Sequence, residues 1–254
     1  MTDIIKAARP KRTFFAVSPI VCGIFFLFCL FTLLGIWQIH RFFWKINLIM
    51  RIEERVHLPP IPAPSKSEWP NVTTACCDYL PVQMTGRFLN NKEILITALT
   101  SLGSGYWVLT PFETEDGSIT FINRGFVPMD RKKQETRLAG QIRGTTKISG
   151  LLRMGEENGL YPHRNDPMAD LWYTRELASM ARVRGFLEVA PYFIDVDQTS
   201  GMHDIPIGGM TRITFSNNHL TYAMTWFVLA GGVLLSPVIV TLYNRKSGDQ
   251  QINK

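Results

Sequence analysis

Two long apolar stretches, one near each end, constrain what this chain can fold into. The first covers residues 14–39 and the second residues 222–243, and neither contains a charged side chain. A helix rises about 1.5 Å per residue, so roughly 20 residues cross a hydrocarbon core about 30 Å thick. Inside lipid no water satisfies the backbone, which favours a helix for each stretch. The sequence therefore predicts two transmembrane helices with a larger domain, residues 40–221, between them.

The distribution of charge indicates an orientation. The tails, residues 1–13 and 244–254, hold seven basic and two acidic residues, whereas residues 40–221 hold 20 basic and 19 acidic ones. Such an excess is typical of cytoplasmic ends. Four basic residues do follow the first span on the outer side: Arg41, Lys45, Arg51 and Arg55. A long translocated domain overrides such local charge. The basic balance is then a topology signal, and no nucleic-acid partner is expected.

The first apolar stretch is interpreted as a retained anchor. It is longer than the apolar region of a signal peptide, and the bulky residues 37–44 offer no small-residue cleavage site. The 13 residues before it do not resemble a long leader rich in Arg and Ser. We therefore expect a multi-pass protein of a bacterial inner membrane, with both tails cytoplasmic and the main domain periplasmic.

The segment between the spans is expected to form a β-dominated α+β domain. Apolar spacing continues the first helix beyond residue 39, and a proline-rich stretch within residues 58–70 ends it as an extended linker. Short runs rich in β-branched and aromatic residues then predict strands. These runs are Val82–Phe88, Glu93–Thr97, Tyr106–Glu113, Ile119–Val127, Lys147–Leu152, Pro191–Asp195 and Arg212–Phe215. One helix is predicted over Leu171–Val183.

Known catalytic signatures are missing from the sequence. There is no phosphate-binding loop, nucleophile elbow, zinc-protease motif or dinucleotide fingerprint, so the chain is not expected to be an enzyme. Cys76 and Cys77 are adjacent and lack a second pair, which argues against a disulfide framework or a zinc site. Asp195 and Asp197 share one side of a predicted strand and could hold a cation, although such pairs are usually solvated.

Two histidines stand out because each lies at the outer end of a predicted span. His40 closes the first span and His219 opens the second, so both would lie at the same membrane boundary. Tyr222 and Trp226 fall three and seven residues after His219, on one helix face. We hypothesise that the two imidazoles clamp a flat cofactor with a metal, such as haem. The alternative is a plain aromatic belt, which requires no ligand.

Small residues would let the two spans approach closely. They are Gly35 on the first span, and Ala223, Ala230 and Gly231 on the second. Among the arginines, Arg124 and Arg212 could bind cofactor propionates, or they could be ordinary surface charges.

Several segments, in order, resemble the Surfeit locus protein 1 family of cytochrome c oxidase assembly factors. The first is Leu34-Gly-Ile-Trp-Gln38 with Arg41 and Trp44-Lys45. The next are Gly86-Arg-Phe88, Gly105-Tyr-Trp-Val-Leu-Thr-Pro111 and Asn123-Arg-Gly-Phe-Val-Pro128. Asn165-Asp-Pro167 with Trp172, Arg175 and Met180-Ala181 follows, and residues 217–226 resemble the family's entry into its second span.

The resemblance implies a membrane-bound assembly factor for haem–copper oxidases. It implies haem a as a cofactor, with the role of haem ligand falling on His219. The expected partners are the catalytic subunit of cytochrome c oxidase and, as a further candidate, haem a synthase. His40 has no place in the family pattern, so the clamp rests on the residues alone. Two alternatives stay open: a haem-independent scaffold for the maturing subunit, and a haem-modifying enzyme, which the lack of an acid–base set disfavours.

Overall fold

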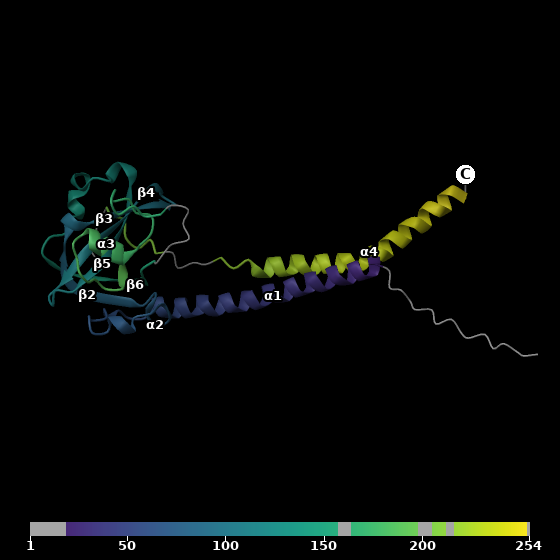
Figure 1. Cartoon of the computed structure of the whole chain (residues 1–254), viewed down its shortest axis with the longest axis horizontal. Helices are drawn as coiled ribbons and strands as arrows, with labels where there is room; N and C mark the ends of the chain where they lie inside the picture. The colour runs from purple at the N-terminus through teal and green to yellow at the C-terminus, as the bar shows by residue number, and fades with distance from the viewer. Residues whose placement is uncertain (1–18, 157–163, 198–204, 212–215, 253–254) are drawn as a thin grey trace, which may run out of the picture. The chain divides into compact units, whose positions relative to one another are not determined.

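The computed structural model describes residues 19–156, 164–197, 205–211 and 216–252 (Figure 1). The chain divides into two compact units. One combines residues 1–48 with 216–254, and the other is residues 49–215. This division matches the expected plan of two apolar helices that flank a sheet-rich domain, and each unit is described by itself below.

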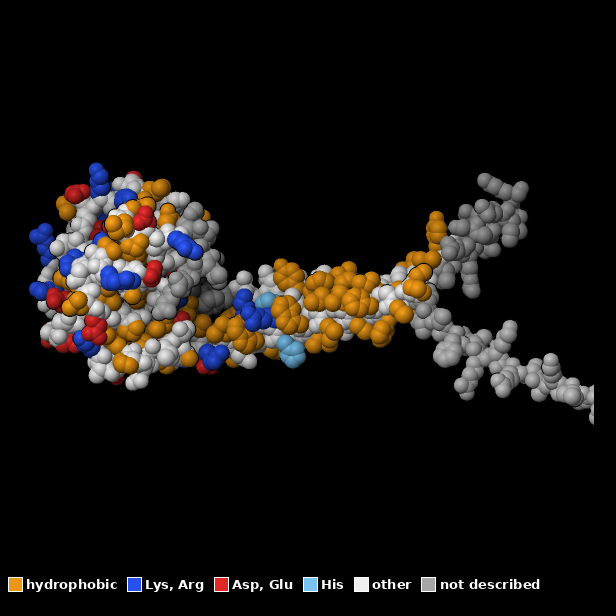
Figure 2. All heavy atoms as spheres, viewed as in Figure 1, with side chains coloured by type: hydrophobic (Ala, Val, Ile, Leu, Met, Phe, Trp, Pro, Cys, Tyr) orange, Lys and Arg blue, Asp and Glu red, His pale blue; other side chains and the backbone are white. Residues whose placement is uncertain are grey.

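The first unit is built on two helices: α4 (His219–Ile252) and the part of α1 (Pro19–Val56) that precedes residue 49. They run side by side in Figure 1, and the rings of Phe31 and Trp226 stack between them with centroids 5.7 Å apart. Both helices are long and apolar enough to cross a membrane. Figure 2 shows hydrophobic side chains over most of their surface, whereas charged side chains are dispersed over the other unit. The protein is therefore a membrane protein with two candidate spans.

Small residues let α1 and α4 approach closely, as the sequence predicts. Gly35 is buried, and a Cβ atom at this position would lie 2.8 Å from the Phe227 ring. Ala223 and Ala230 are buried as well, at 1% and 3% exposure. The prediction is wrong for Gly231, because a Cβ atom there would meet nothing within 4 Å.

The second unit contains a closed ring of five strands. They are β2 (Pro81–Phe88), β4 (Gly103–Thr114), β5 (Ile119–Pro128), β6 (Thr145–Met154) and β7 (Tyr192–Val196). The pairing order is β2–β6–β7–β5–β4, and β2 also pairs with β4, which closes the ring. Two further strands, β1 (Ile61–Pro62) and β3 (Ile94–Thr100), extend it at β2 and β4. The β5–β7 pairing is parallel, and the other pairings within the ring are antiparallel.

Two apolar cores lie on opposite faces of these strands. Ring residues such as Val82, Phe112 and Ile194 fill the interior. Neighbours along a strand point to opposite faces, so Phe193 belongs instead to an outer core with Ile96, Trp172 and others. The helix α3 (Leu177–Val183) covers this outer face with Leu177, Met180 and Ala181.

The predicted helix over Leu171–Val183 is too long at its start. Residues before Leu177 are not helical, because Trp172 pairs with Ile96 through the backbone and its side chain is 1% exposed. The other strand predictions fall on β2 to β7, except Arg212–Phe215, which lies outside the described residues. A short helix, α2 (Thr74–Cys77), and 3₁₀ turns at 69–71, 90–92, 129–131 and 134–140 complete the unit.

The proline-rich stretch is more than a linker. Ile61 and Pro62 pair with β2, and the Pro64 carbonyl accepts hydrogen bonds from the Tyr192 hydroxyl at 2.8 Å and the Trp69 indole at 3.3 Å. Just before it, α1 continues to Val56 as expected, and Ile52 on its last turns is buried. The segment therefore binds the sheet through backbone pairing with β2 and through the hydrogen bond from Tyr192.

Cys76 and Cys77 form a disulfide with each other. The sequence argument was directed against a disulfide framework, and it did not predict this bridge between adjacent residues. Two cysteines that are adjacent in sequence can bond to each other, so the bridge needs no cysteine from another part of the chain. The turn itself is held by Arg55, whose guanidinium donates to the carbonyls of Ala75 at 2.7 Å and Asp78 at 3.2 Å.

Candidate functional site

His219 is the first residue of α4 and is half-buried. Its Nδ1 lies 2.7 Å from Oε1 of Gln38 on α1. An amide oxygen can only accept, so Nδ1 carries the proton and Nε2 presents its lone pair. Among the described residues, Nε2 has no hydrogen-bond partner. The contact therefore fixes the tautomer with the proton on Nδ1, and Nε2 keeps a lone pair that can bind a metal.

His40 does not share this contact. It lies two residues after Gln38, about 200° around the helix, and its side chain is exposed. Trp226 is half-buried against Phe31, whereas Tyr222 is 56% exposed. The structure thus brings His219 together with Gln38 and places Trp226 in the helix contact, while His40 and Tyr222 lie on open surfaces.

Arg124 has a different setting, in the interior of the sheet-rich unit. Its side chain is fully buried, with the guanidinium 4.8 Å above the Phe88 ring. It donates to the carbonyl of Gly140 and, at 3.2 Å, to Oδ1 of Asn90. Burial lowers the pKa of Arg124 to about 10, so it stays charged at neutral pH. A ligand could reach this side chain only if the domain opened. Arg212, the other arginine singled out from the sequence, lies outside the described residues.

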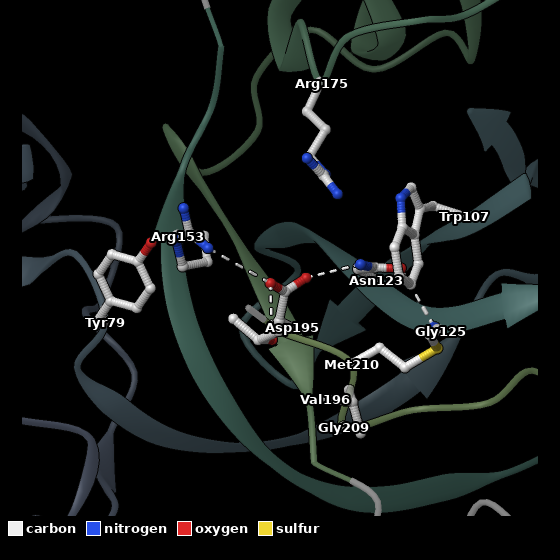
Figure 3. Close-up of a pocket in the computed structure, with 11 residues that line it drawn as sticks. Tyr79, Trp107, Asn123, Gly125, Arg153, Arg175, Asp195, Val196, Gly209 and Met210 are labelled. Carbon is white, nitrogen blue, oxygen red and sulfur yellow. Dashed lines mark hydrogen bonds and ion pairs between the residues drawn. The ribbon is translucent and has the colours of Figure 1, made fainter. Parts of the chain in front are cut away.

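The sheet-rich unit also contains a cavity of about 320 Å³ on the outer face of the ring (Figure 3). Side chains from four ring strands and three other segments line it. They are Tyr79, Trp107, Asn123, Gly125, Arg153, Arg175, Asp195, Val196, Gly209, Met210 and Thr211. Its volume is at the lower end of the range for small-molecule pockets. Burial raises the pKa of Tyr79, so its hydroxyl is protonated at neutral pH.

Asp195 and Asn123 form the polar floor of this cavity. They are register partners on the parallel strands β7 and β5, and Nδ2 of Asn123 donates to Oδ1 of Asp195 at 2.7 Å. Oδ2 of Asp195 accepts from the Thr211 hydroxyl at 3.0 Å and lies 3.8 Å from Nη1 of Arg153. Both carboxylate oxygens are thus engaged by protein donors. Asp197, expected to share its side of the strand, follows the end of β7.

Two arginines form the charged walls. Nε of Arg153 donates to Asp78 at 3.0 Å, and its guanidinium lies 4.0 Å above the Tyr79 ring. Arg175 donates from Nη1 to Glu156 at 3.1 Å and lies 5.2 Å above the Phe193 ring. In Figure 3 the Arg175 guanidinium points into the cavity, between Arg153 and Trp107.

Sequence reasoning missed this cavity, although it quoted several of its residues. Trp107, Asn123 with Gly125, and Arg175 belong to three of the segments that carry the family resemblance. The usable signal was one polar residue in each of two strand-like runs, Asn123 and Asp195. Only the parallel β5–β7 register shows that they meet.

The SURF1 family model matches residues 25–231, from the first apolar helix to the second. The chain belongs to the SURF1 family. Surfeit locus protein 1 of Rattus norvegicus is 38% identical over 213 residues, which cover 77% of this chain and 67% of the relative. The Homo sapiens protein of the same name is 37% identical, with 78% and 69% covered. A SURF1-like protein of Monosiga brevicollis is 32% identical, with 85% and 84% covered.

The SURF1 family match includes both residues of the His219–Gln38 contact and all residues that line the cavity. Both sites therefore belong to the part of the chain that is shared with the family. Among the described residues no cluster of three or more His, Cys, Asp or Glu side chains could hold a metal ion.

Proposed function

We propose that this SURF1 family member is a non-enzymatic assembly factor for haem–copper cytochrome c oxidase, which binds haem a and assists its insertion into the catalytic subunit. The observation that carries the haem part is the contact between His219 and Gln38 at 2.7 Å. The oxidase part rests on family membership, from which the assembly role was inferred in the sequence analysis. The imidazole and its surroundings fit haem on three grounds.

The first ground is the state of the imidazole. A ligating histidine usually donates its other ring N–H to an oxygen acceptor, which fixes the ring and raises its basicity. Gln38 supplies this acceptor to Nδ1, and Nε2 is the ligating nitrogen. Haem a, when bound, would supply an iron that accepts an imidazole nitrogen. His219 would hold it, and Gln38 would orient His219.

The second ground is the apolar, aromatic surroundings. Trp226 stacks against Phe31, and Tyr222 projects from the first turn of α4. Flat aromatic side chains at a helix pair suit a flat macrocycle. The exposed His40 would contact a haem only at the outer surface of α1, so the two-histidine clamp requires the haem to reach around the helix.

The third ground is location. The charge excess of the tails supports cytoplasmic ends in an inner membrane, and the candidate span of α4 begins at His219. His219 would then lie at the outer membrane boundary. A carrier there can pass an apolar cofactor to an oxidase subunit in the same bilayer, and haem a synthase is the proposed donor.

The direct test is an absorbance spectrum and pigment extraction of the full chain, purified from cells that make haem a. We expect haem a in the wild-type protein and at least a tenfold loss of occupancy in His219→Ala. Gln38→Ala should weaken haem binding by about 10–100-fold, the usual cost of losing an outer-shell partner. His57→Ala is the matched control, since His57 is exposed and lies in the other unit.

Each outcome separates the candidate functions. An equal loss of haem a occupancy in His40→Ala and His219→Ala would support the two-histidine clamp. Unchanged occupancy and ligand-field bands in both would rule out the proposed ligand. A colourless protein that still co-purifies with the oxidase catalytic subunit would favour the haem-independent scaffold.

A further inference from the structure

The cavity on the outer face of the strand ring has no part in the proposed haem site. Every residue that lines it belongs to the sheet-rich unit, residues 49–215. Its volume is about 320 Å³, at the small end of the range for small-molecule pockets. A ligand of this size carries one or two functional groups, so the groups in the wall decide its chemistry.

The hydrogen-bond acceptors in the wall are already engaged. Oδ1 of Asp195 accepts from Asn123, and Oδ2 accepts from Thr211. Oδ1 of Asn123 accepts from the Gly125 backbone N–H at 3.2 Å. Each of these three side-chain oxygens therefore already receives one hydrogen bond from the protein.

The hydrogen-bond donors in the cavity wall include the guanidinium groups of Arg153 and Arg175, and those of Arg175 are only partly used by the protein. Arg153 is held between two carboxylates, Asp78 and Asp195. Arg175 is held by Glu156 through Nη1, and its Nε is buried with no hydrogen-bond partner among the described residues. Nη2 of Arg175 likewise has no partner among the described residues. A guanidinium has five N–H donors in a planar fork that matches a carboxylate. Arg175 can therefore receive a second carboxylate from the cavity side.

The remaining wall is aromatic and apolar. The ring of Trp107 stands beside the cavity in Figure 3, with Met210 and Val196 below it. Trp107 is only half-buried; its ring packs edge-to-face against Phe126 at 5.9 Å, and the Arg175 guanidinium lies 6.0 Å from its centroid. A flat apolar group can stack against this ring while an attached carboxylate reaches Arg175.

We infer that this cavity binds an aromatic carboxylate, with Arg175 as the anchor for the carboxylate and Trp107 as the platform for the ring. Such a group has two sources: a small aromatic acid, or the free C-terminus of a peptide that ends in an aromatic residue. Both present the same chemistry to Arg175 and Trp107. The inference does not depend on haem binding by the helix pair.

The test follows Trp107 by ¹⁹F NMR in the full chain, labelled with 5-fluorotryptophan and held in detergent micelles. The chain has six tryptophans, and Trp107→Phe identifies the signal of interest. The probes are benzoate and phenylacetate for the small acids, and acetyl-Gly-Phe for the peptide terminus, each added at millimolar concentrations. Their amides serve as the uncharged counterparts.

We expect at least one carboxylate to shift the Trp107 signal, and its amide to bind at least tenfold more weakly, as loss of a charge-assisted hydrogen bond implies. Arg175→Gln should weaken binding at least tenfold, and Arg175→Lys should restore part of it. Arg87→Gln is the matched control, since Arg87 is an exposed arginine paired with Glu113. The Trp69 and Trp172 signals report whether each variant is folded.

The outcomes decide both the chemistry and its source. A response to the small acids alone identifies a metabolite-like ligand, and a response to acetyl-Gly-Phe alone identifies a peptide terminus. The inference is overturned if acid and amide bind equally, if Arg175→Gln binds as the wild type does, or if no carboxylate moves the signal. A haem-loaded protein that fails this test would leave the proposed function intact.

Discussion

Asp197, just after β7, is half-buried, and burial raises the pKa of its carboxyl above the usual range. The folded protein then holds this proton more tightly than the unfolded chain does. Stability from this group is therefore greatest below the unfolded pKa and falls as pH rises through the folded pKa. We expect Asp197→Asn to raise the melting temperature at pH 7, and the gain to shrink as the pH falls towards 4. Thermal unfolding across this pH range measures it.

Asp116 provides a control of opposite sign. Hydrogen bonds from Thr114 and Ser118 lower the pKa of its carboxyl, so its stabilising effect is present at neutral pH and is lost on acidification. Asp116→Asn should therefore lower the melting temperature at pH 7. If both variants shifted the melting temperature in the same direction at pH 7, burial of Asp197 would not be the cause.

At the scale of elements, the contact between α1 and α4 depends on Gly35. A leucine there would place its Cβ 2.8 Å from the Phe227 ring, closer than packed carbon atoms approach. We expect Gly35→Leu to lower the melting temperature of the chain in detergent, because overpacking typically costs 1–3 kcal/mol. Gly23→Leu is the matched control, since nothing lies within 4 Å of a Cβ atom there.

If Gly35→Leu and Gly23→Leu lowered the melting temperature equally, the packing of α1 against α4 would not be what stabilises this unit. A loss in Gly35→Leu alone should be accompanied by weaker haem binding. The reason is that His219 and Gln38 meet across the same pair of helices.

Helices and strands were predictable from the sequence where a local pattern of residue types alone determines them. The strands β2 to β7 follow β-branched and aromatic runs. Residues 19–39 of the first apolar stretch lie in α1 and the second stretch lies in α4, whereas residues 14–18 lie outside the described residues. The start of α3 was not predictable, because Trp172 is drawn into backbone pairing with Ile96, about 75 residues earlier. Local helix signals cannot report a partner so distant in sequence.

The candidate sites show the same limit. His219 was identified because its position at the end of an apolar stretch is visible in the sequence. The hypothesised clamp pairs it with His40 through a cofactor, and the side chain that contacts it directly is Gln38. The helical period alone does not fix which face of α1 meets α4. The cavity was missed because its floor joins Asn123 and Asp195 through a parallel register that no local pattern encodes.

For the whole molecule, the two spans make a prediction about sidedness. Both tails should lie on one side of the membrane and the sheet-rich unit on the other, because the basic excess is confined to the tails. We expect a membrane-impermeant maleimide to label Met168→Cys from the outside of sealed cells, since Met168 is 98% exposed in the sheet-rich unit. Ser247→Cys, in the C-terminal tail, should react only in inverted vesicles. The reverse pattern would show that the domain is cytoplasmic.

The closed ring of strands also has a consequence for how the chain is made. β7 lies between β5 and β6, so both keep an open edge until residues 192–196 have been synthesised. Exposed edges invite pairing with other chains. The apolar helix α4 begins soon afterwards, at His219. The strand that closes the ring and the second membrane helix therefore leave the ribosome almost together, so the ring closes only as the chain is anchored for the second time.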